Sequence, residues 1–275
     1  MNIHDLADMR RALASDSLKR VDIRFDFSGV PDISSWVTIF PNTSLGAIFS
    51  DYQMEASHQG QYDAVALSSL ANLVGIPEKS IVEMPMHVFI EGKLDGHDDI
   101  LSLTMDNVSC QLTILCRNYT SIDDYIDWML QLFDMLRRDN KMCRLRRMAI
   151  RKLDAFMSDN MDNLGAWLVL GKFYDEAIPL GIGYETCYED KFTDYSSETP
   201  AFIINTRLFR VGQSGKQTVY QALVDLQANI DYDMVMELPT AESAKLKKLA
   251  SSLNDLLFKL FLRYITPEYI DTHRK

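Results

Sequence analysis

The chain has 275 residues, of which 47% are hydrophobic and 24% charged, and its formal net charge is −11. These proportions exclude a wholly disordered chain, and the length allows a sizeable core without disulfides or structural metals. The acidic balance opposes non-specific binding to nucleic acid and to anionic membranes, so we expect no membrane partner.

The first strand is predicted at VDIRFDF, residues 21–27. Its apolar residues alternate with Asp22, Arg24 and Asp26, which is the period-two pattern of a half-buried strand. These three polar side chains share one face of the strand, where we expect their charges to pair internally. Before this strand, the spacing of the leucines predicts a short amphipathic helix over residues 1–18.

The other elements of the first half follow from the same two periodicities. They are, in chain order, a helix at 31–36, a helix at 64–74, strands at 86–92, 100–106 and 108–116, and a long helix. Ser121 is the expected N-cap of the long helix, and Asp124 completes an approximate capping box.

The second half is expected to repeat this order of elements. They are a strand at 144–153, a helix at about 161–173, strands at 202–211, 218–227 and 229–238, and a long leucine-rich helix. Thr240 is the expected cap of that last helix, and Pro267 is expected to end it. Its wide apolar stripe is typical of a core helix and leaves room for a dimer contact.

Both halves therefore read as a strand, a helix, three strands and a helix, and we divide the chain into residues 1–140 and 141–275. This order predicts an α+β protein in which an antiparallel sheet is backed by long helices. The arrangement resembles the helix-grip or TATA-binding-protein kind of repeat, which implies a fold and no function.

The cysteines and the opening residues indicate where the protein resides. The four cysteines form no C-x-x-C pair, and their spacing matches no zinc motif. The opening MNIHDLADMRR carries charges where a signal peptide needs an apolar stretch, and no run reaches the roughly 18 apolar residues of a membrane span. We therefore expect a cytoplasmic protein with reduced cysteines and without cofactor or metal.

Known catalytic motifs find no good match along the chain. The segment GQSGKQT, residues 212–218, resembles a phosphate loop, but Arg210 and Gln217 occupy two positions that the signature reserves for other residues. A strand pattern follows it instead of a helix, so a glycine-rich hairpin turn is the favoured interpretation. The histidines lack metal-ligand spacing, and no G-x-S-x-G motif nominates a nucleophile.

The largest local charge lies in RRDNKMCRLRRMAIRK, residues 137–152, which holds eight basic residues and one acidic residue. The candidate binding residues are those on or beside its strand: Arg144, Arg146, Arg147, Arg151 and Lys152. Arginines suit bidentate contacts with phosphate, which indicates nucleic acid or a phosphate ligand. We favour the alternative, in which these residues pair with carboxylates or dock a partner chain, because arginines on both sides of a strand are hard to bury unpaired.

Two segments of the chain carry a resemblance to a known family. They are YTSIDDYIDWMLQLFDML, residues 119–136, and CRLRRMAIRKLD, residues 143–154. These runs resemble a sporadically distributed bacterial family whose central strand reads approximately R-I-G-L-R-Y-I-N. The matching positions are Tyr119, Arg147, Met148, Ala149, Ile150, Arg151, Lys152, Leu153 and Asp154, and the family's closing F-x-x-x-I-T segment is matched by Phe261, Ile265 and Thr266. Ala149 departs from the family's glycine, and Asp154 departs from its asparagine. The resemblance implies no activity, and the family's patchy distribution implies mobile or defence-associated genes.

Three functional hypotheses follow, in order of preference. The first is a non-catalytic binding or assembly protein that uses a sheet surface, or a groove between its halves, to bind a protein partner or a second copy of itself. The second is recognition of nucleic acid or a phosphate ligand through residues 144–152. The third is a metal-dependent hydrolase on Asp225, Asp231 and Asp233, since carboxylates can hold magnesium; the solvent side of an alternating strand is the favoured interpretation of these three residues.

Overall fold

The computed structural model describes residues 17–30, 32–56, 85–117, 121–196 and 199–273, together with residues 9, 13 and 119. The described chain is an α+β fold built on one sheet of nine strands, and each strand runs antiparallel to its neighbours. The strands are β1 (Leu18–Ser28), β2 (Asp51–Ala56), β3 (Pro85–Gly92), β4 (Ile100–Met105), β5 (Ser109–Leu115), β6 (Arg144–Ser158), β7 (Glu185–Asp194), β8 (Ala201–Ser214) and β9 (Gln217–Asp231). The described helices are α2 (Ser34–Ile39), α4 (Asp123–Asp139), α5 (Met161–Trp167), α6 (Ser243–Phe261) and α7 (Pro267–Thr272).

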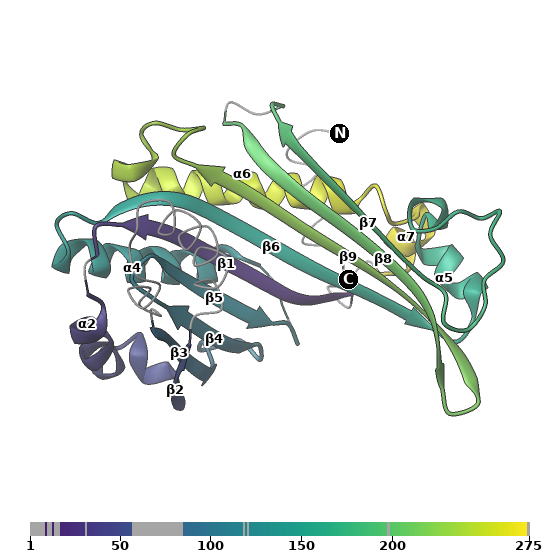
Figure 1. Cartoon of the computed structure of the whole chain (residues 1–275), viewed down its shortest axis with the longest axis horizontal. Coiled ribbons are helices and arrows are strands. Elements are labelled where there is room, and N and C mark those ends of the chain that lie inside the picture. The colour runs from purple at the N-terminus through teal and green to yellow at the C-terminus, as the bar shows by residue number, and fades with distance from the viewer. Residues whose placement is uncertain are drawn as a thin grey trace, which may run out of the picture.

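The order of strands across the sheet is β2-β3-β4-β5-β1-β6-β9-β8-β7, which places β1 and β6 at its centre (Figure 1). These two central strands pair with Ile23 opposite Ile150. On one side of them lie the strands of the first half of the chain, and on the other side lie those of the second half. The longest strands, β6 and β9, pair along most of their length.

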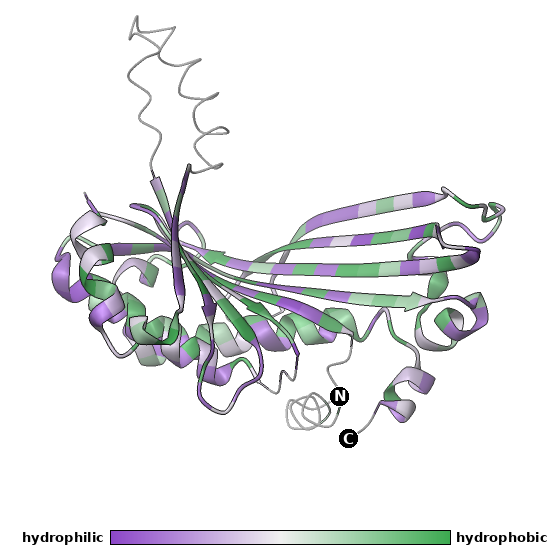
Figure 2. Ribbon diagram, turned by 90° about the horizontal axis from the view of Figure 1, so that it is seen from below, coloured by the Kyte–Doolittle hydropathy of each residue, from purple (hydrophilic) through white to green (hydrophobic). Residues whose placement is uncertain are grey.

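The two long helices cover one face of this sheet, and the other face carries no described helix (Figures 1 and 2). On β1, Val21, Ile23 and Phe25 are fully buried on the helix side, as their alternation with charged residues predicts. The ring of Phe25 meets the ring of Phe133 on α4 edge to face, with centroids 5.5 Å apart. The core therefore lies between the sheet and the pair α4 and α6.

One of the strands predicted in the second half needs correction. The strand predicted at 218–227 is confirmed as part of β9, which continues to Asp231, but the predicted strand at 229–238 is mostly wrong. The carbonyl of Asp231 accepts hydrogen bonds from the amides of Met234 and Val235, so the chain turns there, and a 3₁₀ helix follows at Leu238–Thr240. The apolar alternation extends past the strand, but Met236 is 66% exposed, so the last part of that pattern faces solvent.

The strand β7 was not expected from the sequence. Most of its residues are exposed, whichever face of the sheet they lie on, because β7 forms the edge of the sheet and α6 does not cover it. A strand exposed on both faces has no apolar alternation, and that alternation is the signal on which the strand predictions rely. The edge strand carries the charged residues Glu189, Asp190 and Lys191, which discourage pairing with another edge.

Several predicted helix boundaries are also wrong. The helix α4 begins at Asp123 with Ile122 at the cap position, and Ser121 instead bonds the amide and carboxylate of Asp123. The last long helix begins at Ser243 and ends at Phe261, so Thr240 does not cap it. Pro267 starts the separate helix α7, where the Thr266 side chain accepts a hydrogen bond from the amide of Tyr269. A proline at the first helical position lacks only an amide that would have no partner.

Other predictions are confirmed in substance. The strands at 86–92, 100–106 and 108–116 are β3, β4 and β5, and the strand from Arg144 runs on to Ser158. The GQSGKQT segment is the β8–β9 hairpin, in which Gly215 takes φ +62° at the first turn position. The short helix predicted at 31–36 lies at Ser34–Ile39, and the one at 161–173 ends at Trp167 because Leu168 adopts extended backbone. The predicted helix at 64–74 lies outside the described residues, as does most of the predicted helix at 1–18, whose last residue, Leu18, instead begins β1.

Candidate functional site: the open face of the sheet

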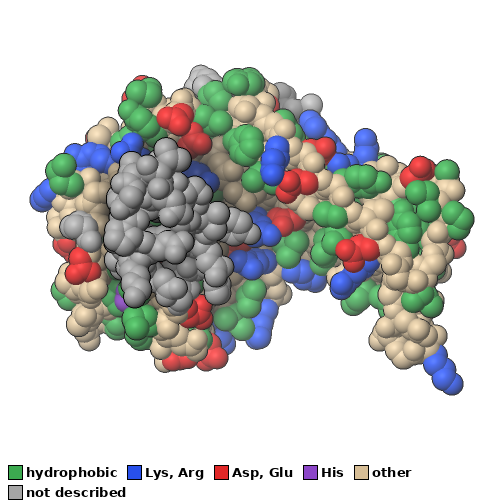
Figure 3. All heavy atoms as spheres, viewed as in Figure 1, with side chains coloured by type: hydrophobic (Ala, Val, Ile, Leu, Met, Phe, Trp, Pro, Cys, Tyr) green, Lys and Arg blue, Asp and Glu red, His purple; other side chains and the backbone are tan. Residues whose placement is uncertain are grey.

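The face of the sheet away from α4 and α6, here called the open face, carries charged side chains on its central strands. On β1 the residues opposite the buried apolar ones are Arg20, Asp22, Arg24 and Asp26. Their side chains follow one another at every second residue with alternating sign. In Figure 3, which views the molecule as Figure 1 does, basic and acidic side chains are intermixed on the middle of this face.

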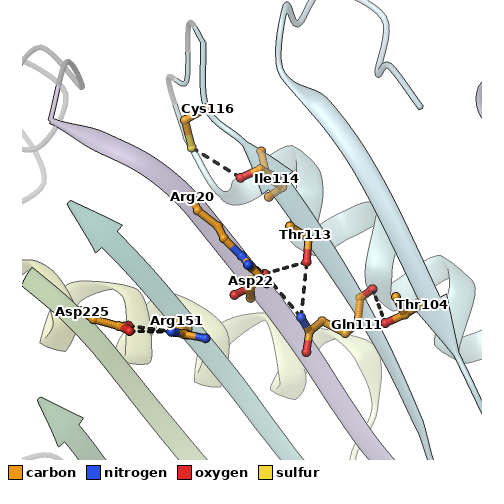
Figure 4. A network of polar contacts seen from close by, with 9 residues as sticks. All are labelled: Arg20, Asp22, Thr104, Gln111, Thr113, Ile114, Cys116, Arg151 and Asp225. Atoms are coloured by element: carbon orange, nitrogen blue, oxygen red, sulfur yellow. Dashed lines mark hydrogen bonds and ion pairs between the residues drawn. The ribbon is translucent and has the colours of Figure 1, made fainter. Parts of the chain in front are cut away.

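One part of this surface is centred on Asp22, whose side chain is almost fully buried. Its Oδ1 accepts hydrogen bonds from Arg20 Nε at 2.9 Å and from Thr113 Oγ1 at 2.6 Å, and Gln111 Nε2 lies at 3.4 Å (Figure 4). Both partners on β5 stand opposite or diagonal to Asp22 in the strand register. The carboxylate is thus held in place by groups from two strands.

A second part is centred on Asp26. Its Oδ1 accepts a hydrogen bond from Arg24 Nε at 2.6 Å, and its Oδ2 accepts one from Arg147 Nε, also at 2.6 Å. Arg147 is the residue opposite Asp26 on β6. The expected internal pairing of Arg24 with Asp26 is confirmed, and it extends to an arginine from the other half of the chain.

A third part joins β6 to β9. Arg151 makes a two-pronged contact with Asp225, with Nε at 2.8 Å from Oδ1 and Nη2 at 2.5 Å from Oδ2 (Figure 4). This fork geometry gives strength and direction to a charge-assisted bond. The carboxylate beside it raises the pKa of Arg151 and so favours its charged form. Next to this pair, Gln227 Nε2 donates to Asn229 Oδ1 at 2.9 Å.

The five basic residues singled out from the sequence do not converge on one point. Arg147 and Arg151 lie on the open face, each bonded to an aspartate. Arg144 donates to the carbonyls of Lys141 and Cys143, both at 2.9 Å.

The remaining two basic residues contact aromatic rings. Arg146 donates to Ser28 Oγ at 2.9 Å, and its guanidinium lies 5.2 Å from the centroid of Tyr232. Lys152 lies 5.9 Å from the ring centroid of Tyr119, and such an arrangement attracts a cation to the ring. The five residues are therefore spread along the strand instead of forming one basic patch.

The three aspartates of the hydrolase hypothesis are also separated in role. Asp225 is occupied by Arg151, Asp231 is the last residue of β9 opposite Arg147, and Asp233 lies in the turn that follows. Within the described ranges, no cluster of three or more histidine, cysteine or acidic side chains is arranged to hold a metal ion.

No described helix is both long and apolar enough to cross a membrane.

Sequence reasoning did not identify the full extent of the open face. Gln111 and Thr113 join it because β5 and β1 are neighbours, and Arg20 joins it because β1 begins before the strand predicted at 21–27. The alternation of polar with apolar residues within each strand was the available signal.

No family model, no curated protein and no solved structure matches this chain.

Proposed function

We propose that this protein is a non-catalytic assembly protein whose open face binds a second copy of the same chain. The observation that supports this is the sign pattern along β1, where Arg20, Asp22, Arg24 and Asp26 point to one face. Read in the opposite direction, the signs of these four residues are inverted. Two copies related by a two-fold axis that passes between them, above the middle of β1, therefore place Arg20 against Asp26, while Asp22, whose side chain is almost fully buried, stays in its own network.

This self-complementarity is what a symmetric dimer requires, because the same patch must match itself. Side chains at every second residue of a strand lie about 6.8 Å apart, so the two symmetry-related contacts between Arg20 and Asp26 lie roughly 20 Å apart. Arg20 uses Nε in its intramolecular bond with Asp22, and 39% of its side chain is exposed. A guanidinium has five N–H donors in all, so Arg20 keeps donors for Asp26 of the second copy.

The size of the face is compatible with a stable interface. Nine strands spaced about 4.8 Å apart span roughly 38 Å, and the central strands β1 and β6, of 11 and 15 residues, run about 34 Å and 48 Å along their length. A standard interface buries about 800 Å² on each partner. A fraction of the open face is therefore enough.

The charge balance favours a protein partner over a polyanion. Arg147 and Arg151, the arginines expected to contact phosphate, are each bonded to an aspartate. A polyanion would have to compete with Asp26 and Asp225 for them, and affinity for nucleic acid comes mainly from phosphate contacts of free cations. A protein surface with both signs can instead add to the existing pairs.

The strand order also supports the proposal that residues 1–140 and 141–275 are two related halves of the helix-grip or TATA-binding-protein kind. Outward from the centre, β1 is followed by β5, β4 and β3, and β6 is followed by β9, β8 and β7. Each half ends in a long helix on the same face. A cytoplasmic location and membership of the sporadically distributed, defence-associated family complete the proposal.

Charge reversal and charge exchange on β1 test the dimer. Arg20→Asp places two carboxylates against each other in the two-fold arrangement and should abolish the dimer. Adding Asp26→Arg to the same chain restores opposite signs at both contacts and should restore association. Lys248→Asp, on the exposed side of α6, changes the net charge by the same amount and is the control for the added negative charge.

Sedimentation velocity over a range of protein concentrations measures the outcome, and circular dichroism checks that each variant folds. The proposal expects a dimer for the native chain and the control, a monomer for Arg20→Asp, and a dimer for the double exchange. A native chain that stays monomeric at high micromolar concentration refutes it. Dimerisation that is unchanged by Arg20→Asp also refutes it. Salt-dependent binding of a DNA or RNA duplex that is lost with Arg147→Ala and Arg151→Ala refutes it as well.

A further inference from the structure

A cleft of about 550 Å³ lies on the helix side of the sheet, at the C-terminal end of α6 and against β7 and β8. Its walls include Lys172, Phe192, Asn205, Arg207 and Arg263. A second hollow adjoins it on the other side of Arg207 and shares Lys172 and Arg207 with it. A volume of this size is typical of sites for small organic ligands.

Arg207 stands at the junction of the two hollows with its side chain mostly buried. Its guanidinium lies 5.5 Å from the ring centroid of Tyr188 and 5.8 Å from that of Tyr264. Nη2 contacts Asp190 at 2.5 Å, and Nη1 donates to the carbonyl of Lys172 at 3.0 Å. Its buried Nε has no hydrogen-bond partner among the described residues.

Asn205 lies two residues away on the same face of β8 and is only 4% exposed. Its Nδ2 donates to the hydroxyl of Tyr264 at 2.6 Å, while no group in the described part of the chain bonds its Oδ1. Buried polar groups are normally satisfied, and an unpaired donor and acceptor side by side need an explanation. A bound ligand that draws these side chains toward the cleft would provide their partners.

The charges around the cleft are unbalanced in the opposite sense to the whole chain. Four basic and two acidic side chains line it. Lys191 pairs with Glu189 and Arg207 pairs with Asp190, whereas Lys172 and Arg263 make no ion pair with any described residue. Two exposed cations at the rim of a cleft, in a chain of net charge −11, favour an anionic ligand.

Aromatic rings provide the remaining chemistry. Tyr188 and Phe192 lie on the helix-side face of β7, and 41% and 38% of their surface is exposed. They flank Asp190, the partner of Arg207, at the entrance to the two hollows. Exposed rings beside an arginine form a platform on which a planar group can stack.

We propose that this cleft binds a small phosphate monoester that carries a planar ring, of the nucleoside monophosphate class. Its phosphate is held by Lys172 and Arg263, with Arg207 behind them, and its ring stacks on Tyr188 or Phe192. The proposal concerns the helix side of the sheet and is independent of assembly through the open face.

Isothermal titration calorimetry with AMP, CMP, adenosine and inorganic phosphate as separate probes tests the cleft. Because Lys172 and Arg263 are exposed, Lys172→Ala with Arg263→Ala should leave the fold intact. It should weaken nucleotide binding by about tenfold or more, the effect of losing charge-assisted hydrogen bonds. Lys245→Ala with Lys248→Ala removes the same charge from the exposed side of α6 and should leave the affinity unchanged.

The expected result is that AMP or CMP binds more tightly than adenosine and than phosphate, and that Tyr188→Ala or Phe192→Ala weakens the nucleotide but not phosphate. Adenosine binding as tightly as AMP overturns the proposal, as does nucleotide binding that survives the Lys172 and Arg263 substitutions. Failure of both nucleotides to bind at millimolar concentration overturns it as well. The monomeric Arg20→Asp variant should bind the nucleotide normally, so this test and the assembly test can fail separately.

Discussion

Asp154 on β6 offers a quantitative test of how the centre of the molecule is stabilised. The residue is 6% exposed, and its Oδ1 accepts a hydrogen bond from Ser17 Oγ at 2.9 Å. Ser17 Oγ in turn accepts one from the hydroxyl of Tyr269 at 3.1 Å. Burial raises the pKa of Asp154 from 3.8 to about 6, although the Ser17 hydrogen bond and the charges of Lys152 and Lys19 oppose the shift.

A raised pKa means that the folded protein holds this proton more tightly than the unfolded chain does. Below about pH 4 the carboxyl is protonated in both states, and it contributes no pH-dependent term. As the pH rises from about 4 to 6, the unfolded chain releases this proton while the folded protein still holds it, so stability falls, and the loss is complete once the pH has passed the folded pKa of about 6. The shift of about two units corresponds to roughly 3 kcal/mol of lost stability above the folded pKa.

Asp154→Asn removes the titration and keeps an acceptor for the Ser17 hydroxyl. We expect this variant to match the native chain near pH 4 and to exceed its free energy of unfolding by up to about 3 kcal/mol at pH 7 to 8. Urea denaturation followed by circular dichroism at several pH values measures the difference.

The control is Asp159→Asn, at an exposed carboxylate in the turn after the same strand. It should leave the pH dependence of the native chain unchanged. The reasoning is refuted if the difference in free energy of unfolding between the native chain and Asp154→Asn stays constant from pH 4 to 8. Burial of a charged Asp154 would then not cause a pH-dependent loss of stability.

Four further substitutions test the fold. Phe133→Ala removes a fully buried ring from between α4 and β1 and should lower the free energy of unfolding by about 3–5 kcal/mol in urea. Gly29→Ala should lower the free energy of unfolding clearly more than Gly96→Ala in the same assay. Both glycines have a left-handed φ, which costs an alanine about 1 kcal/mol. A Cβ at Gly29 would also lie 2.0 Å from the Met142 carbonyl oxygen, whereas a Cβ at Gly96 would have no described atom within 4 Å. Thr266→Ala should cost about 1 kcal/mol, because it removes the side-chain cap of α7. Equal losses for the two glycines, or no loss for the other two, would contradict these assignments.

The sequence predicted those elements whose burial differs strongly between two faces. The alternation of Val21, Ile23 and Phe25 with charged residues identified β1, and the apolar stripe of α4 identified that helix. The edge strand β7 was not predicted, because both of its faces are exposed. The strand expected at 229–238 was misplaced, because the apolar alternation continues beyond the end of β9.

The candidate sites depend on pairings that a single sequence does not contain. The charge alternation of β1 was visible, but Arg147 meets Asp26, and Arg151 meets Asp225, only through the order of strands in the sheet. The cleft around Arg207 was not anticipated. Within its own strand pattern Arg207 is an ordinary polar position, and Lys172 and Arg263 are brought to it by the fold alone.

Crosslinking between two different cysteine variants tests the assembly proposal most directly. Arg20→Cys and Asp26→Cys are prepared separately in a Cys187→Ser background, because Cys187 is the exposed native cysteine among the four. Cys116 stays protonated and unreactive, since burial raises its pKa to about 12. The reagent is a bismaleimide that spans about 10 Å, the usual distance between packed sheets.

The two-fold arrangement predicts a crosslinked dimer when the two variants are mixed. Neither variant alone should give this product, because the same residue in the two copies lies roughly 20 Å apart along the strand. Crosslinking of either variant with itself, or no crosslinking in the mixture, would contradict assembly through the open face.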